Sequence, residues 1–124
     1  MIVKFITAIV IGVVALAPSD LKRFRKGTFR ITDEHGIHCT LVRKKNIQTE
    51  RTIFGRSELD LYWENDSTYY LFSPRTLTGK DLWQEFGTDS IKNVIREIRG
   101  DSCRVTSSSQ QKDIVMDFWM VKIK

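Results

Sequence analysis

The sequence predicts a mainly β domain, an antiparallel meander of about seven or eight strands closed into a small barrel or half-barrel. The clearest evidence follows Ser57, where Leu59, Leu61 and Trp63 alternate with polar side chains. This alternation is typical of a strand with one buried face and one solvated face. Clusters of turn-forming residues separate the β-prone runs at short spacing, and short turns join antiparallel strands because parallel strands need long crossovers. We therefore expect consecutive strands to pair.

The first two predicted strands form a hairpin. They flank residues 33–36, where Gly36 can take the positive φ that a tight turn needs. Further turns are predicted at residues 44–46, 64–67 and 99–102, and Gly55 ends the third run. The predicted strands cover residues 28–32, 37–45, 47–53, 57–64, 68–72, 91–98, 103–105 and 114–123.

Residues 91–98 fit two patterns. Ile91, Val94, Ile95 and Ile98 follow a helical stripe, but the same residues fit a strand that is partly buried on both faces. The turn residues around Gly100 that follow directly favour the strand, because Gly and Asp are common at hairpin tips.

The stretch after the fifth strand is expected to be irregular. Pro74 should end that strand, because proline has no N–H for a ladder of hydrogen bonds. Apolar side chains within residues 81–86 then predict one short helix over an end of the sheet. A polar loop is expected at residues 107–111.

The N-terminus is predicted to be an export signal. Lys4 precedes an apolar run from Phe5 to Ala17, which is about thirteen residues long, whereas a membrane span needs about twenty. Cleavage after Ala15 or after Ala17 fits the small residues there, and Pro18 favours the first; without cleavage the segment would remain as an anchor. We divide the chain into a signal peptide over residues 1–17 and a single β-domain over residues 18–124, exported to the periplasm, outer envelope or extracellular space.

Charge and size exclude several classes of protein. The remaining chain of about a hundred residues suits one domain. A net charge of +5 is mild and mixed in sign, and the signature of an RNA-binding sheet is missing, so we expect no nucleic-acid partner. After signal cleavage, no stable membrane span is expected.

The two cysteines are a candidate disulfide. Cys39 and Cys103 would be able to pair in an oxidising compartment and close a long loop. Two buried thiols that act as small hydrophobic groups are the alternative.

Several short motifs resemble one family. Lys26-Gly27-Thr28-Phe29 opens the first strand, Gln48-Thr49-Glu50 follows Arg43, and Trp63-Glu64-Asn65-Asp66 precedes Tyr69 and Leu71. This pattern resembles small, functionally uncharacterised exported proteins of Bacteroidota-type bacteria. The resemblance implies a small β-rich exported domain and no catalytic residue. Members often have a cysteine where this chain has Ser67.

Two groups of side chains are candidate binding residues. Arg43, Gln48 and Glu50 are a distinctive polar set, and Arg43 would be able to pair with Glu50 if their strands are neighbours. The pair would then either close one end of the barrel or lie at the mouth of a ligand cavity. Tyr62 and Tyr70 fall on the wetter face of their strands, where they would stack on a sugar ring or fill a partner's pocket.

The sequence gives little support to catalysis or metal binding. His35 and His38 would face opposite sides of a strand, so we expect no metal site and no cofactor. Catalytic triads, phosphate-binding glycine loops and paired carboxylates in apolar settings are missing, so we expect no enzyme and no catalytic residue.

These observations lead to two hypotheses about function. The first is an exported, non-enzymatic module, similar in architecture to lipocalins, that binds a small apolar ligand, a glycan or a protein. The alternative is a structural or interaction subunit of the cell envelope whose interior is fully packed. The first would be favoured by a continuous apolar cavity lined by Leu59, Leu61, Trp63, Met116, Phe118 and Met120.

Overall fold

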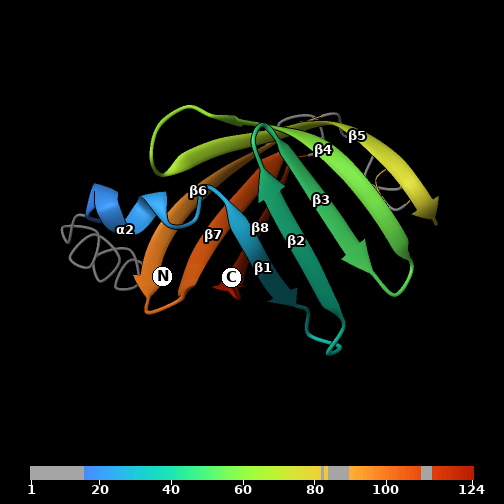
Figure 1. The fold of residues 1–124 in the computed structure, drawn as a ribbon, viewed down its shortest axis with the longest axis horizontal. Helices are drawn as coiled ribbons and strands as arrows, with labels where there is room; N and C mark the ends of the chain where they lie inside the picture. Colours follow the sequence, from blue (N-terminus) through green and yellow to red (C-terminus); the bar gives the residue numbers. More distant parts are fainter. Residues whose placement is uncertain (1–15, 82, 84–89, 110–112) are drawn as a thin grey trace.

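The computed structural model describes residues 16–81, 83, 90–109 and 113–124, so the predicted signal segment lies almost entirely outside the described residues. Across this part of the chain, eight antiparallel strands form a closed barrel (Figure 1). The mainly β fold predicted from the sequence is confirmed. The elements are α2 (Pro18–Lys22), β1 (Gly27–Thr32), β2 (His38–Lys44), β3 (Ile47–Thr52), β4 (Gly55–Trp63), β5 (Thr68–Gly79), β6 (Ser90–Arg99), β7 (Ser102–Ser109) and β8 (Ile114–Lys122).

The strands follow a simple meander. Each strand pairs with the next one along the chain, and β8 returns to pair with β1, which closes the barrel. Residues 91–98 lie in a strand, β6, as the following turn at Gly100 predicted. The hairpin between β1 and β2 also forms as expected: Gly36 has a φ of 81°, and the Asp33 side chain accepts hydrogen bonds from the backbone N–H groups of His35 and Ile37.

The seam between β1 and β8 is short. The two strands pair at Phe29 with Lys122, Arg30 with Val121 and Ile31 with Met120. By contrast, β8 stays paired with β7 from Val121 back to Ile114. The seam therefore extends over only part of β8, and the rest of that strand borders the mouth of the barrel.

Two boundaries differ most from the predictions. The fifth strand continues through Pro74 to Gly79, because Ser73 takes a positive φ of 51° and the β4–β5 register shifts between Glu58 and Asp60. Proline is tolerated at such an irregularity, where its missing N–H breaks no regular ladder. The start of the predicted loop at residues 107–111 is instead the end of β7, whose ladder with β8 reaches Ser109.

One short helix covers one end of the barrel, which we call the closed end. It is α2, which the sequence did not predict; the predicted helix over residues 81–86 lies largely outside the described residues. Pro18 begins α2, where its missing N–H costs no hydrogen bond. Leu21 and Phe24 bury their side chains below the helix, and the ring centroid of Phe24 lies 6.2 Å from that of Phe29.

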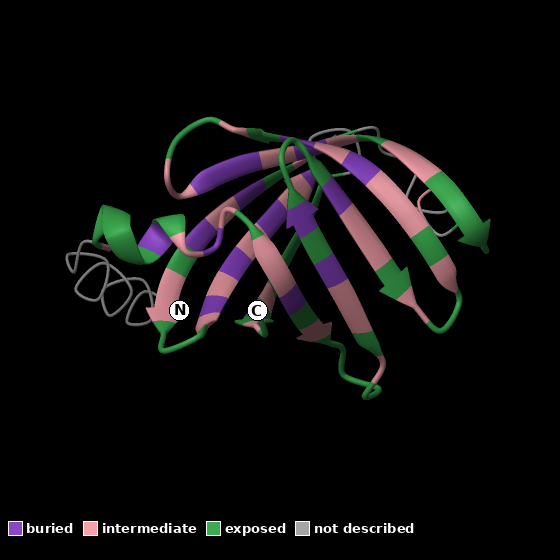
Figure 2. Ribbon diagram, in the orientation of Figure 1, coloured by how far each residue is buried: buried purple, intermediate pink, exposed green. Residues whose placement is uncertain are grey.

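The core fills the half of the barrel next to this helix (Figure 2). Leu59 and Leu61 on β4 are buried, while Tyr62 between Leu61 and Trp63 is 58% exposed, so the predicted inner and outer faces are confirmed. Trp63 is half-buried, and its ring centroid lies 4.6 Å from that of Tyr69. Among the described residues, no helix is long and apolar enough to cross a membrane.

Candidate functional site

The half of the barrel away from α2 encloses a cavity of about 870 Å³. We call this end the open end; the β1–β2 and β3–β4 connections lie there. The cavity volume is in the range of small-molecule sites, about 300–1,000 Å³. Its apolar lining comes from inward-facing positions of five strands, β1, β2, β5, β6 and β8: Ile31, Cys39, Leu41, Leu71, Ile91, Ile114, Met116 and Phe118.

The floor of the cavity is built around Arg43. This side chain is 2% exposed, and β2 directs it into the barrel on the same face as Leu41. Its guanidinium donates hydrogen bonds to the Gln48 side-chain oxygen at 2.8 Å, to the Phe24 carbonyl at 2.7 Å and to the Tyr69 hydroxyl at 2.6 Å. Arg43 therefore ties β2, β3 and β5 to the segment that closes the barrel.

Aromatic rings surround the same guanidinium. Its central carbon lies 4.3 Å from the ring centroid of Tyr69, 5.1 Å from that of Phe29 and 5.7 Å from that of Trp63. A cation held over ring faces is attracted by their quadrupoles, and this attraction is stronger away from water. The rings and the three acceptors together compensate the burial of a charge that would otherwise be costly.

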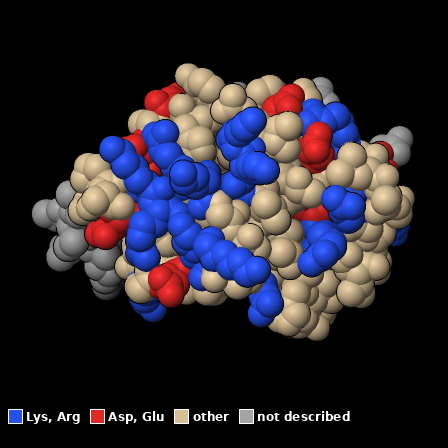
Figure 3. Space-filling model, in the orientation of Figure 1, with Lys and Arg blue, Asp and Glu red and all other residues tan. Residues whose placement is uncertain are grey.

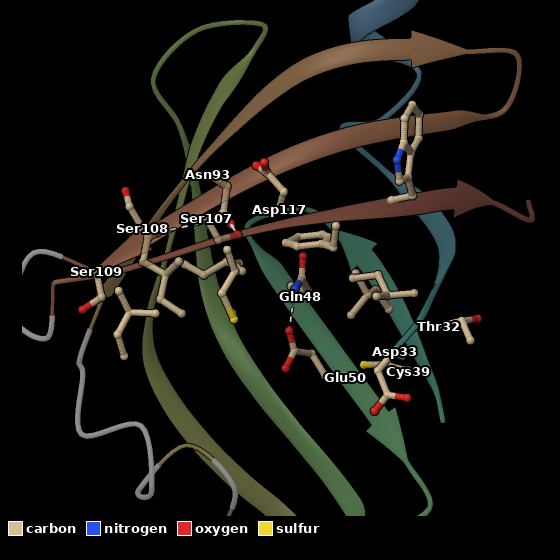
Figure 4. Close-up of a pocket in the computed structure, with 18 of the residues that line it drawn as sticks. Thr32, Asp33, Cys39, Gln48, Glu50, Asn93, Ser107, Ser108, Ser109 and Asp117 are labelled. Atoms are coloured by element: carbon tan, nitrogen blue, oxygen red, sulfur yellow. Dashed lines mark hydrogen bonds between the residues drawn. The ribbon is translucent and has the colours of Figure 1, made fainter. Parts of the chain in front are cut away.

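A polar chain leads from Arg43 up the β3 wall towards the open end, and Figure 4 shows its second link, between Gln48 and Glu50. Gln48 lies directly opposite Arg43 in the β2–β3 register, and its amide nitrogen donates to the Glu50 carboxylate at 2.8 Å. The Trp83 indole N–H donates to the other oxygen of the same carboxylate at 3.2 Å. The predicted set of three residues is thus brought together, with Gln48 as the link between the charges.

Glu50 has an unusual environment for a carboxyl group. Burial raises its pKa, while hydrogen bonds from Gln48 and Trp83 and the charge of Arg43 act in the opposite direction. The side chain is half-buried and lines the cavity. The cavity therefore contains an acceptor group that has lost much of its water.

A second polar cluster lies on the β6–β7 wall. Asn93, Ser107 and Ser109 are buried and line the cavity. The Ser107 hydroxyl donates to the Asn93 side-chain oxygen, and the Asn93 amide donates to the carbonyl of Ile91 at 3.2 Å. The sequence analysis missed this cluster, although the alternation of Cys103 and Val105 continues unbroken through these serines.

The mouth of the cavity lies beside the short β1–β8 seam. Thr32, Asp33 and Glu34 line it from the β1–β2 hairpin, and Asp117 and Trp119 line it from β8. Asp117 accepts a hydrogen bond from Thr106 and lies 3.7 Å from Arg104. Carboxylates thus predominate at the opening.

The other predicted binding residues lie elsewhere. Tyr62 and Tyr70 pair across β4 and β5 on the outer surface, with ring centroids 6.4 Å apart, and neither lines the cavity. Their predicted outward orientation is correct, but they share no site with Arg43, Gln48 and Glu50.

The candidate disulfide is not formed. Cys39 and Cys103 are both free, on β2 and β7, which are not neighbours in the barrel. Burial raises the pKa of each thiol to about 12, with the nearby Glu50 charge as a further cause at Cys39. The structure therefore contains two free thiols, of which Cys103 is buried and Cys39 is half-buried.

The two histidines lie at the rim. His35 is at the tip of the β1–β2 hairpin, and the His38 ring nitrogen Nδ1 is 2.8 Å from the Thr32 hydroxyl. Within the described residues, no group of three or more His, Cys, Asp or Glu side chains is placed to hold a metal ion.

Comparisons of the chain with protein-family models, curated proteins and solved structures found no match. The resemblance to exported Bacteroidota-type proteins stays a prediction. Any function must therefore be argued from the cavity itself.

Proposed function

We propose that this protein is a non-enzymatic binding module that holds a small, mostly apolar molecule inside the barrel. The observation that supports the proposal is the cavity of about 870 Å³, whose walls carry Leu71, Ile91, Met116 and Phe118. Concave, largely apolar sites with a few convergent polar groups are typical of ligand pockets. A purely structural subunit would gain stability by filling this space with side chains.

The cavity occupies a different part of the barrel from the one that alternation alone suggested. Met116 and Phe118 line it, but Leu59, Leu61 and Met120 are packed into the core next to α2, and Trp63 packs against that core. The barrel thus divides into a packed half, which supports folding, and an open half, which is available for a ligand.

The expected affinity follows from buried area. A ligand that buries roughly 300 Å² of apolar surface gains about 7.5 kcal/mol. Loss of translational and rotational freedom offsets part of this gain. We therefore expect dissociation constants in the micromolar range or weaker for simple probes.

A fluorescent probe tests the proposal. N-phenyl-1-naphthylamine is neutral and apolar, and its emission rises on transfer from water into an apolar site. Ile91→Trp places a large ring inside the cavity, whereas Val115→Trp makes a comparable change at a position on β8 that is 68% exposed. We expect Ile91→Trp to weaken probe binding at least tenfold and Val115→Trp to leave it unchanged, with both variants folded by circular dichroism.

Equal binding by both variants, or no binding by the unmodified protein, would contradict the proposal. The first result would place the probe outside the barrel. The second would show that the space does not accept apolar molecules of this size.

Export of the domain remains part of the proposal. It is supported by Lys4 and the apolar run that follows it. Expression in a bacterium with the N-terminus intact should yield protein outside the cytoplasm that begins at Leu16 or Pro18, as read by N-terminal sequencing. An intact Met1 on cytoplasmic protein would argue against it.

A further inference from the structure

We propose that the cavity selects molecules whose apolar body carries a hydrogen-bond-donating head, such as an amine or a hydroxyl, and rejects carboxylates, with Glu50 as the residue that recognises the head. This inference rests on the proposed function of the cavity and adds the chemical class of the ligand. The inference rests on a comparison of the polar side chains inside the barrel. Some of them already have hydrogen-bond partners and little exposed surface, whereas others remain accessible from the cavity.

The interior cation offers little accessible surface to an anionic ligand. Each of the three nitrogens of Arg43 donates one hydrogen bond, to Gln48, Phe24 and Tyr69, and only 2% of the residue is exposed. A buried arginine with free N–H groups facing a cavity would be the natural partner for a carboxylate. Here the aromatic rings of Phe29 and Tyr69 cover the guanidinium instead.

The Gln48 side chain is also engaged. Its oxygen accepts from Arg43, its nitrogen donates to Glu50, and the residue is 1% exposed. Because the Arg43 hydrogen bond fixes the orientation of the amide, Gln48 cannot turn its nitrogen to serve another acceptor. The floor of the cavity therefore offers few accessible hydrogen-bond donors to a ligand whose head group can only accept.

Glu50 differs from both residues. It is half-buried, it lines the cavity, and Figure 4 shows its carboxylate pointing into the pocket. It receives one hydrogen bond from Gln48 and one from Trp83, whereas an ionised carboxylate has about four lone-pair sites. Burial has raised its pKa, so the charged form would gain from a donor that replaces lost water.

Charges at the mouth favour the same class of ligand. Asp33, Glu34 and Asp117 line the opening, although Arg104 partly compensates Asp117. The exterior is different: lysines and arginines gather on the face that carries α2 and β1 (Figure 3). A carboxylate that enters the barrel must therefore pass groups of its own charge, whereas an ammonium is attracted to them.

A matched series of ligands tests the inference. Decylamine, decanol and decanoate share one apolar chain and differ only in the head group. Each is used below its aggregation limit to displace N-phenyl-1-naphthylamine from the full chain at pH 7. We expect decylamine to displace the probe at a concentration at least tenfold lower than decanoate does, with decanol between them.

A variant assigns this preference to Glu50. Glu50→Gln keeps the shape of the side chain but removes the charge, so the amine should lose at least tenfold in affinity while decanol changes little. Glu58→Gln is the matched control, because Glu58 on β4 pairs with Arg75 at 3.0 Å and does not line the cavity. This control should keep the ranking of the unmodified protein. Binding of the probe by each variant checks that the cavity is intact.

The outcomes separate this inference from the proposed function. If the probe binds but decanoate competes as well as decylamine, the head-group inference is wrong and the apolar cavity remains. If Glu50→Gln keeps the full preference for the amine, Glu50 is not the residue that recognises the head. If neither the probe nor any of the three ligands binds, the proposed function fails. The ranking in the unmodified protein decides the ligand class without any variant.

Discussion

Replacing Arg43 by methionine should destabilise the domain by about 3 kcal/mol. The substitution leaves the Gln48 side-chain oxygen, the Phe24 carbonyl and the Tyr69 hydroxyl without the donor that each now has. A buried polar group that loses its partner costs about 1–3 kcal/mol. The variant no longer buries a charge, which offsets part of the summed cost of the three groups, and some of these groups will find new partners. The net loss of stability is therefore well below the sum of three full penalties.

Urea unfolding followed by tryptophan fluorescence measures the effect. A loss of about 3 kcal/mol is a large share of the 5–15 kcal/mol typical of a domain and should lower the melting temperature by more than 10 °C. Arg30→Met is the control, because Arg30 lies on β1 with its side chain exposed, and this change should cost less than about 0.5 kcal/mol. Arg43→Lys keeps the charge but lacks the planar fork that reaches three acceptors, so it should also be destabilising.

The reasoning would be refuted by an Arg43→Met variant as stable as the Arg30→Met control. That result would mean that the cost of burying the guanidinium cancels everything its hydrogen bonds and ring contacts contribute. A double-mutant cycle with Tyr69→Phe gives a second check, because residues in direct contact should show a coupling of at least about 0.5 kcal/mol.

Three further predictions concern pH, the register of β4 and the thiols. Because burial raises the pKa of Glu50, the folded state binds the carboxyl proton more tightly than the unfolded chain does. The contribution of Glu50 to folding stability is therefore largest below the ordinary glutamate pKa and is lost as pH rises through the raised pKa. Urea melts should show Glu50→Gln gaining stability relative to the unmodified protein as pH rises above the ordinary glutamate pKa, and a stability difference that does not change with pH would count against the raised pKa. Trp63→Ala should cost about 3 kcal/mol and Tyr62→Ala less than about 1 kcal/mol in the same assay; the reverse order would exchange the faces of β4. Thiol titration in denaturant without reductant should give two thiols per chain, and a value near zero would mean that a disulfide forms. In the folded protein Cys39 should be alkylated faster than Cys103, because Cys103 is 0% exposed.

Alternation was sufficient to predict much of the barrel. Leu59 and Leu61 face inward and Tyr62 faces outward, as a period of two requires, and short turns led to antiparallel neighbours. The pairing of Arg43 with Gln48 across β2 and β3 follows from the tight turn between the two strands, although the inward orientation of Arg43 was not predicted. Local sequence patterns were enough to predict these features because each feature depends on a single strand or a single hairpin.

Features that depend on several strands at once were not predictable. Alternation tells which way Ile91 and Met116 point, but not whether other side chains fill the space between them. Ser107 was interpreted as part of a loop because it is polar, although its partner Asn93 lies across the β6–β7 pair. The passage of β5 through Pro74 similarly depends on a shift in its register with β4.

The central claim is that a small apolar molecule binds inside the open half of the barrel. Intermolecular nuclear Overhauser effects between the alkyl chain of decanol and methyl-labelled protein test this most directly. The account predicts contacts to the methyl groups of Leu71, Ile91 and Met116, which line the cavity, and none to Val121, which does not. Contacts confined to Val121 and other outward-facing residues, or no contacts at a saturating concentration, would contradict it.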